Sequence, residues 1–419
     1  MARSIVGYFL FLLVALWLRD ESDMKLAKSW KPVVYGVLFQ IAIGLAITNM
    51  PVFVTCMECV ARGVMKLRDA TLEGTKFVFG YVGGGEPPFN LKDGGSPFVF
   101  AFQALPTVII VSTLSAILTY LRILPYLAKV VGYIFKVIFK IKDSIGMVAA
   151  AKMFVGQLEA PLLIKNKLPT LAQSDIFIIL TLAFSTSSAA VMPVYAGALE
   201  AICPTAMQHI VTASVMTVIS ALIVCALVMP RKEKDLDEYA EKASQEAAAE
   251  KEEKFMGAVN RGISDGAFVW WCIVGSLIGM IALLAFVNYL LDILPNVGGG
   301  PITLQRIFGM VMYPFAWLIG IQDSDLVAVA QVLGTKIAAN EMVAFFELAK
   351  ANISPGSVVK TIYAINNFGN FSCIGITVGG LLAMAPGQKC IPAIVGKAFM
   401  AGLLATGLTA SLMGVIISL

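Results

Sequence analysis

Two carboxylates, Glu159 and Glu341, lie 182 positions apart (341 minus 159) in otherwise hydrophobic sequence. Each follows an amide side chain closely, Gln157 in the first case and Asn340 in the second. A charged side chain near the middle of a bilayer costs roughly 2.5 to 3.5 kcal/mol on insertion scales, so such acids usually mark a substrate or ion path. The two acidic patches therefore predict a transport site.

The side chains around these acids suit a ligand that has two different ends. Gln157 and Glu159 offer carboxylate oxygens with an amide donor and acceptor, which suits a planar ring with N–H and C=O edges. Glu341, with its amide neighbour, can accept hydrogen bonds from vicinal hydroxyls, as a sugar requires. Asn370 adds a donor and an acceptor, and Phe368 adds an apolar or stacking face. The set indicates a ligand with a heterocyclic end and a polyol end.

The sequence leaves two other interpretations of the acids open. They could be structural groups paired with Lys152 and Lys336, or they could be a catalytic dyad. No HExxH or nucleotide-binding glycine loop accompanies them, so we do not expect an enzyme. Cys56 and Cys59 lack a second pair or a histidine cluster, and His209 is the sole histidine. We therefore expect neither a metal site nor a cofactor.

The composition is that of a polytopic membrane protein. Of 419 residues, 58% are hydrophobic and 14% are charged, and the mean hydropathy is +0.83. A soluble chain of this length needs far more surface charge. The net charge of +4 fits basic loops near anionic lipid, and no basic cluster carries the interleaved aromatic residues of a nucleic-acid site. Membrane lipid is thus an expected partner and nucleic acid is not.

The apolar runs predict an all-α fold of eight transmembrane helices and two re-entrant hairpins. Runs 147–164 and 326–346 are too polar to face lipid throughout, and irregular backbone survives at membrane depth only where protein or a water-filled cavity covers it. We expect these two runs to be hairpins, and runs 176–199 and 361–385 to be interrupted helices. The remaining spans are expected at residues 4–18, 33–55, 98–120, 210–229, 267–291 and 391–418.

A hairpin followed by a broken helix occurs twice at a constant offset. The offset is 182 for the carboxylates and again 182 from Ser188 to Asn370 (370 minus 188). This arrangement is typical of secondary transporters built on inverted repeats. The domains that we expect are a scaffold of helices 1–3 with an interfacial segment (1–128), transport repeat 1 (129–230), a charged cytoplasmic linker (231–264), scaffold helix 6 (265–295) and transport repeat 2 (301–419).

The basic residues favour an orientation with both termini outside the cytoplasmic membrane. The main Lys and Arg clusters at 19–31, 129–142, 165–167 and 231–254, together with Lys389, then all fall on the cytoplasmic side. The first hairpin enters from the cytoplasm and the second from outside. Residues 62–92 are basic yet external in this orientation, so we expect an amphipathic interfacial stretch there.

Three motifs make the chain resemble the concentrative nucleoside transporters, as a bacterial member. The runs FVGQLEAP at 154–161 and ANEMVA at 339–344 resemble the tips of their two hairpins. The run NFGNFSCI at 367–374 resembles their seventh-helix motif, and the likeness covers nearly the whole chain. The resemblance implies a homotrimer in which a transport domain moves like an elevator against a scaffold.

The resemblance also implies roles for individual residues. Gln157 and Glu159 would bind the nucleobase, with Val191 packing on it. Leu158 stands beside them where the family usually has a small or hydroxylated residue, which removes a hydrogen bond or a bridging water at the base. Asn366 and Asn367 likewise replace smaller residues. The ribose side is expected to include Asn340, Glu341, Phe368, Asn370 and Cys373, the last in place of a usual serine.

The largest departure from the family pattern is Lys152. Sodium-coupled members have an asparagine there, and their Na⁺ also contacts residues that match Val155, Thr186 and Ser187. An ammonium at this place would repel Na⁺. Lys152 could instead be a tethered cation between hairpin and broken helix, could lose its proton and carry proton coupling, or could extend toward the cytoplasmic funnel.

These observations predict a secondary active importer of nucleosides or nucleoside-like solutes. We expect the coupling ion to be H⁺ in preference to Na⁺ because of Lys152, with no cofactor. The alternative is a gate-like membrane protein of the same fold that handles a different solute or an ion. Leu158, Lys152 and Asn366 favour this alternative, whereas the paired glutamate motifs disfavour it.

Overall fold

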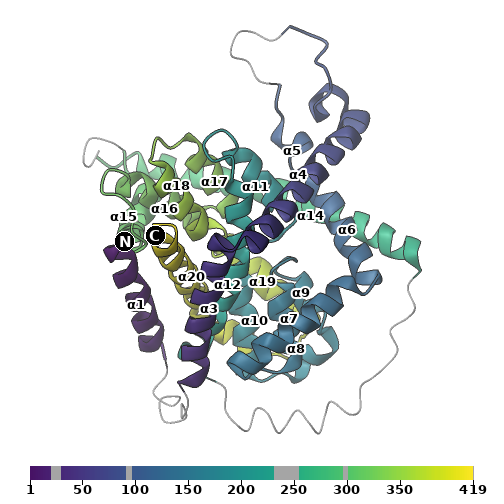
Figure 1. The fold of residues 1–419 in the computed structure, drawn as a ribbon. Coiled ribbons are helices and arrows are strands. Elements are labelled where there is room, and N and C mark those ends of the chain that lie inside the picture. Colours follow the sequence, from purple (N-terminus) through teal and green to yellow (C-terminus); the bar gives the residue numbers. More distant parts are fainter. Residues whose placement is uncertain (20–29, 91–96, 231–253, 296–300, 419) are drawn as a thin grey trace.

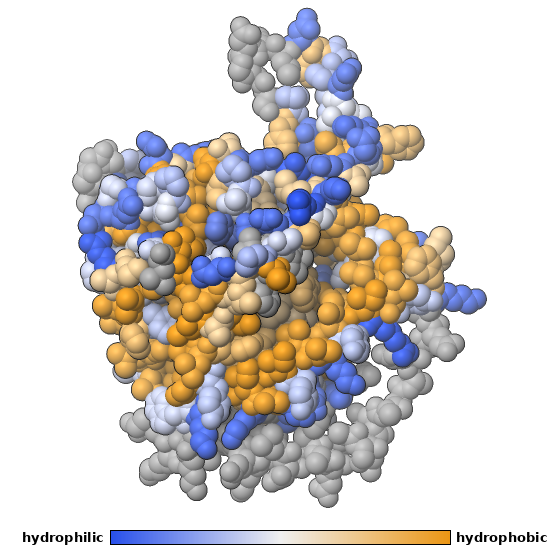
Figure 2. All heavy atoms as spheres, viewed as in Figure 1, coloured by the Kyte–Doolittle hydropathy of each residue, from blue (hydrophilic) through white to orange (hydrophobic). Residues whose placement is uncertain are grey.

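The computed structural model describes residues 1–19, 30–90, 97–230, 254–295 and 301–418, and the regular elements in these ranges are helices. Figure 2 shows a broad apolar surface between polar rims above and below, as a membrane protein requires. Five helical stretches are long and apolar enough to cross a membrane. They are Lys31–Asn49 (α3), Phe100–Tyr120 (α5, Phe100–Gln103, with α6, Thr107–Tyr120), Ala206–Val228 (α12), Phe255–Leu291 (α14) and Cys390–Ile416 (α20).

Six consecutive helices occur twice in the same order, and each member of the second set begins 179 to 184 positions after its counterpart. The first set lies low in Figure 1 at α7 and α8, whereas its counterparts α15 and α16 lie high, so the two repeats approach from opposite faces. The first set is α7 (Ile123–Phe139), α8 (Asp143–Ala151), α9 (Glu159–Leu162), α10 (Gln173–Ser185), α11 (Met192–Leu199) and α12. The second set is α15 (Leu304–Leu318), α16 (Leu326–Ala338), α17 (Glu341–Lys350), α18 (Pro355–Ile365), α19 (Phe371–Met384) and α20.

Both interrupted helices break where the sequence predicts. The first leaves the helical conformation at Thr186, which is extended, and resumes at Met192 with Pro193 in its first turn. Proline is tolerated there because its missing N–H has no partner in a first turn. The second breaks between Ile365 and Phe371. Polar backbone is thus freed in the protein interior at two places.

The hairpin arms differ in detail from the predicted runs. The first hairpin begins at Asp143, before the predicted residue 147, and its return arm is only the four-residue α9 followed by a 3-10 segment, Lys165–Thr170. The second turns sharply at Ala339 and returns through α17, which continues to Lys350. In each hairpin the return helix therefore begins with a glutamate, which lies at the tip.

The predicted span 33–55 is wrong at its end. Helix α3 stops at Asn49, Met50 is extended, and Pro51 opens a separate helix, α4 (Pro51–Phe79). A proline clashes with a helical conformation of the preceding residue, so it ends α3 within an apolar run. The predicted interfacial stretch 62–92 is mostly the continuation of α4, followed by a 3-10 turn at Gly80–Gly83.

Helices α7 and α15 were not predicted, and each packs along the first arm of a hairpin. Both crossings depend on paired glycines. A Cβ on Gly146 would collide with the backbone oxygen of Gly132, and one on Gly334 would lie 2.5 Å from the backbone nitrogen of Gly309. Since the backbones touch, a side chain at either place would push the helix away from its hairpin.

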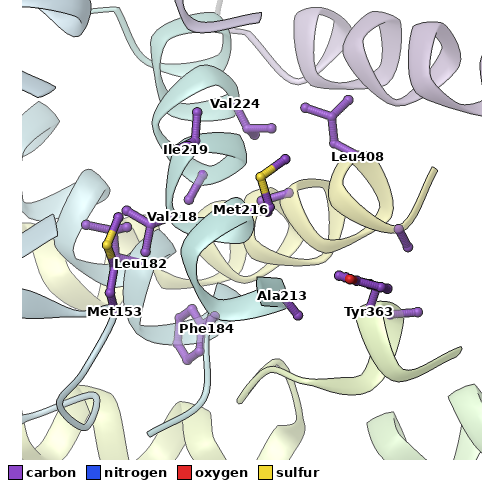
Figure 3. Close-up of a cluster of buried hydrophobic side chains, with 14 of the residues drawn as sticks. Met153, Leu182, Phe184, Ala213, Met216, Val218, Ile219, Val224, Tyr363 and Leu408 are labelled. Atoms are coloured by element: carbon purple, nitrogen blue, oxygen red, sulfur yellow. The ribbon is translucent and has the colours of Figure 1, made fainter. Parts of the chain in front are cut away.

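Helix α12 lies at the centre of the buried core, where its apolar residues pack against other helices (Figure 3). Helix α1 (Ala2–Trp17) packs on α20, and α3 packs on α12. A buried polar chain joins these helices: Tyr8 donates to Gln40 (2.9 Å), Gln40 donates to Ser220 (2.6 Å), and Ser220 contacts Thr409 (2.6 Å). Helices α6 and α14 pack mainly on each other. The predicted domain division remains a prediction.

Candidate functional site

The two helix breaks meet at a buried hydrogen bond. Ser187, in the first break, donates to Oδ1 of Asn366 in the second at 2.6 Å. The amide nitrogen of Asn366 donates to the backbone oxygen of Ile210 (3.0 Å) and to Ser214 (3.1 Å), both on α12. One asparagine therefore uses its oxygen and both of its amide hydrogens to join the repeats, which accounts for an amide where smaller residues were expected.

Glu341 is held by donors from both repeats. Tyr195, on α11, donates its hydroxyl to Oε1 at 2.9 Å, and Asn370 donates its amide to Oε2 at 2.8 Å. The Tyr195 ring stacks on Phe345, with ring centroids 4.3 Å apart. The carboxylate also begins α17, where helix N–H groups favour negative charge. Tyr195 was not among the predicted site residues; its only signal is a hydroxyl in an otherwise apolar half-helix that follows a break.

Two of the predicted ribose residues are helix caps. Oδ1 of Asn340 accepts from the N–H of Val343 at 3.0 Å, and Oδ1 of Asn370 accepts from the N–H of Cys373 at 2.9 Å. Each cap satisfies a backbone donor that a helix start leaves free. The amide nitrogen of Asn370 remains directed at Glu341, so one side chain both starts α19 and orients the acid.

The tip of hairpin 1 rests on α19, which belongs to the other repeat. Thr377 donates to Oε1 of Gln157 at 3.4 Å, and Glu159 accepts from the N–H of Gly156 at 3.0 Å. Leu158 presses against Gly380, where a Cβ would lie 2.5 Å from its methyl carbon. Gln157, Leu158 and Glu159 are each half-buried, so this group retains access from outside the protein core.

Lys152 directly follows α8 as its C-cap residue and is buried, with 1% of its surface exposed. Its ammonium lies 5.3 Å from the centre of the Phe368 ring, and no hydrogen-bond partner for it exists among the described residues. The suggestion that Lys152 extends to the cytoplasmic funnel is therefore wrong. Among the ion pairs of the described residues, none joins Lys152 or Lys336 to Glu159 or Glu341, so the structural pairing is not formed either.

The remaining predicted residues are also buried near the first break. Thr186 and Ser187 are fully buried, and Val155 and Val191 are each 5% exposed. The Thr186 hydroxyl donates to the backbone oxygen of Leu182 at 3.1 Å, while Ser187 donates to Asn366. Both hydroxyls donate their hydrogens to groups of the protein, and their oxygens keep lone pairs that can accept from, or coordinate, a further partner.

Paired hairpins and paired broken helices, with an acid at each hairpin tip, define a secondary transporter. Family models match three segments: "Na+ dependent nucleoside transporter N-terminus" at 6–82, "Nucleoside recognition" at 101–202 and "Na+ dependent nucleoside transporter C-terminus" at 209–414. The chain belongs to the concentrative nucleoside transporter family, an ion-coupled transporter family, and is not an enzyme.

Individual relatives agree with this assignment. An "Uncharacterized transporter" of Haemophilus influenzae is 31% identical over 99% of this chain and 98% of its own length. Human "Solute carrier family 28 member 3" is 29% identical over 93% of this chain, which spans only 56% of that longer protein. The solved structure of CNTnw "in an inward-facing substrate-bound state" matches all of this chain and 98% of its own, with a TM-score of 0.87 and 26% identity.

Proposed function

We propose that the protein imports nucleosides or nucleoside-like solutes across the bacterial cytoplasmic membrane, driven by an ion gradient. The observation that carries this proposal is Glu341, a buried carboxylate oriented by Tyr195 and Asn370 from two repeats. Its remaining lone pairs suit the vicinal hydroxyls of a ribose. Rabbit "Sodium/nucleoside cotransporter 1" is 27% identical over 99% of this chain, and its name supports the solute class.

The nucleobase would bind at the half-buried tip of hairpin 1. Gln157 and Glu159 supply a donor and acceptors, and Val191 an apolar contact. The ribose would bind Asn340, Glu341, Phe368, Asn370 and Cys373.

We further propose H⁺ as the coupling ion in preference to Na⁺. Lys152 places a buried ammonium beside Phe368, and this charge opposes a second cation. A proton taken up and released by Lys152 would then replace a bound metal ion. Val155, Thr186 and Ser187 would surround this coupling residue.

Purified protein in liposomes tests both parts. Labelled nucleosides should accumulate under an inward H⁺ gradient, and Lys152→Asn should lower the response to that gradient. Uptake driven by a Na⁺ gradient alone would overturn the choice of ion and leave the transporter intact. If no nucleoside or free base accumulates under any gradient, the proposal fails.

A second candidate is a transporter of the same fold for a different solute. The contact of Leu158 with Gly380 favours it, because a leucine fills space beside Gln157 and offers no hydrogen bond to a base. Thermal unfolding with panels of nucleosides, bases and sugars separates the candidates, since only a ligand of the folded state raises the midpoint.

The assembly and membrane orientation are also proposals. We propose a homotrimer in which residues 1–128 and 265–295 form the scaffold and the two repeats form the moving body. Both termini would lie outside the cytoplasm. The family resemblance supports the trimer, and the distribution of basic residues supports the orientation.

A further inference from the structure

Lys152 is a buried cation that lies over an aromatic ring and forms no ion pair with a carboxylate among the described residues. An ammonium removed from water is costly unless its charge is balanced or its protons are hydrogen-bonded. Its Nζ has no hydrogen-bond partner among the described residues and makes none of their ion pairs. The contact that remains is the Phe368 face, 5.3 Å away. The face of an aromatic ring is electron-rich and attracts a cation at this distance.

Phe368 occupies a position from which it can act on the solute site. It lies in the second break, two residues before Asn370, and it is half-buried while Asn366, Asn367 and Asn370 are fully buried. Asn370 in turn orients Glu341. The Phe368 ring is therefore only two residues from the side chain that orients the Glu341 carboxylate.

The other charged groups nearby do not replace this contact. Glu159 belongs to the same hairpin and attracts the ammonium through space, but the two form no ion pair, and its Oε2 accepts from the N–H of Gly156. Lys336 approaches the break from the opposite hairpin, since a Cβ on Gly369 would lie 3.1 Å from its Nζ. Two ammonium groups thus flank Phe368 and Gly369. Only the one from hairpin 1 lies over the ring among the described residues.

We propose that Lys152 is a positioning residue, whose ammonium binds the face of Phe368 and so holds the break at 366–370 in the geometry that receives the solute. This inference rests on the proposed function, because the solute site is the one described above. It assigns Lys152 a role in affinity that is separate from the identity of the coupling ion. Hairpin 1 would then act on the ribose side through a ring of the other repeat.

Graded fluorination of Phe368 tests the contact directly. Replacing Phe368 by mono-, di- and trifluorophenylalanine withdraws charge from the ring face while changing its volume little. In the protein with Lys152, nucleoside affinity should fall stepwise, by about ten-fold across the series, as expected for a desolvated cation–ring contact. The same series in Lys152→Met should give a flat response, and Lys152→Arg should restore the slope because it restores the charge.

Two controls keep the outcomes distinct. The same series at Phe346, which packs edge-on against Phe100, should leave affinity unchanged. The thermal unfolding midpoint of each variant is measured without solute. If no nucleoside binds any variant, the proposed function fails. The contact is then still detected if the unfolding midpoint falls across the fluorinated series in the protein with Lys152 and does not fall in Lys152→Met. A flat affinity series with Lys152 present, or an equal slope in Lys152→Met, overturns the inference.

Discussion

Tyr195 and Asn370 bring the two repeats to a single carboxylate, one donor to each oxygen of Glu341. A hydrogen bond to a charged group contributes about 1.5 to 3 kcal/mol, more than one between neutral groups. The stack of Tyr195 on Phe345 fixes the direction of the hydroxyl. The orientation of the acid therefore depends on a residue that itself need not touch the solute.

Removing one hydroxyl measures that dependence. We expect Tyr195→Phe to weaken nucleoside binding about ten-fold, because Glu341 loses the donor that orients Oε1. Titration calorimetry of the purified protein gives the dissociation constant. Tyr363→Phe is a matched control, since Tyr363 is equally buried and its hydroxyl instead contacts His209 at 3.2 Å. Unchanged affinity in Tyr195→Phe would show that Asn370 alone orients the acid.

The positions of the acids could be predicted from the sequence, but their partners could not. Glu159 and Glu341 are visible because a charge in an apolar run is costly and rare. The hydrogen bond from Tyr195 to Glu341 spans 146 positions, and the sequence predicts only a packing role for a tyrosine in an apolar half-helix. The environment of Lys152 was also undecided, because the direction of a long side chain is set by neighbours from the other repeat.

The hairpins are tied at their bases to the broken helices that follow. In repeat 1, Lys142 pairs with the buried Asp175 of α10 at 2.8 Å. In repeat 2, Asp325, in the loop between α15 and α16, accepts from the hydroxyl of Ser354 at 2.6 Å and from its N–H at 3.1 Å. The two ties use different chemistry at corresponding places. Each hairpin is thereby fixed to the helix that carries the break.

The Asp325 tie should give stability that depends on pH. The Ser354 hydroxyl chiefly lowers the pKa of the Asp325 carboxyl, from 3.8 to about 2. A group with a lowered pKa in the folded state stabilises fully above its ordinary pKa and loses that contribution as pH falls through the lowered one. The unfolding midpoint of the protein should thus exceed that of Asp325→Asn by a constant amount above about pH 4 and converge with it toward about pH 2. A gap that is independent of pH would contradict this.

The glycine crossings give a prediction for α7 and α15. Gly146→Ala and Gly334→Ala should each destabilise the fold by about 1 to 3 kcal/mol, because backbone atoms occupy the place of the new methyl group. Gly396→Ala, in α20, is the control. Nothing lies within 4 Å of its Cβ position, so this variant should be more stable than the parent because alanine favours the helix more than glycine does. Denaturation in detergent compares the three. Stability equal to that of the control would show that the helices can separate without cost.

Long apolar helices were predictable, whereas α7 and α15 were not. Each of these helices exposes part of its surface and buries the rest, so neither forms the continuous apolar run that marks a span. The end of α3 was missed for the opposite reason, since hydropathy continues through Pro51 although the helix does not. Composition identifies the segments that lie within the membrane, but it does not identify every position at which the chain changes direction.

At the scale of the whole molecule, the opposed repeats make a prediction about sidedness. Two exposed positions can each be replaced by cysteine: Lys167, after hairpin 1, and Gln322, before hairpin 2. An impermeant maleimide should label Gln322→Cys on intact cells and Lys167→Cys only after permeabilisation. The background should lack the exposed Cys59 and Cys272. Labelling of both positions from one side would overturn the inverted arrangement, and the reverse pattern would overturn only the orientation of the termini.

The two lysines and two glutamates of the site have an electrical consequence. With all four ionised, Lys152 and Lys336 cancel Glu159 and Glu341, so a site loaded with a neutral nucleoside carries no net charge. Moving one charge through 100 mV is worth about 2.3 kcal/mol, and the loaded step avoids that work. Under the proposed H⁺ coupling, release of the proton by Lys152 would leave the empty site with one negative charge. An inside-negative voltage would then drive the empty carrier outward, so voltage would act on the return step and not on the delivery of solute.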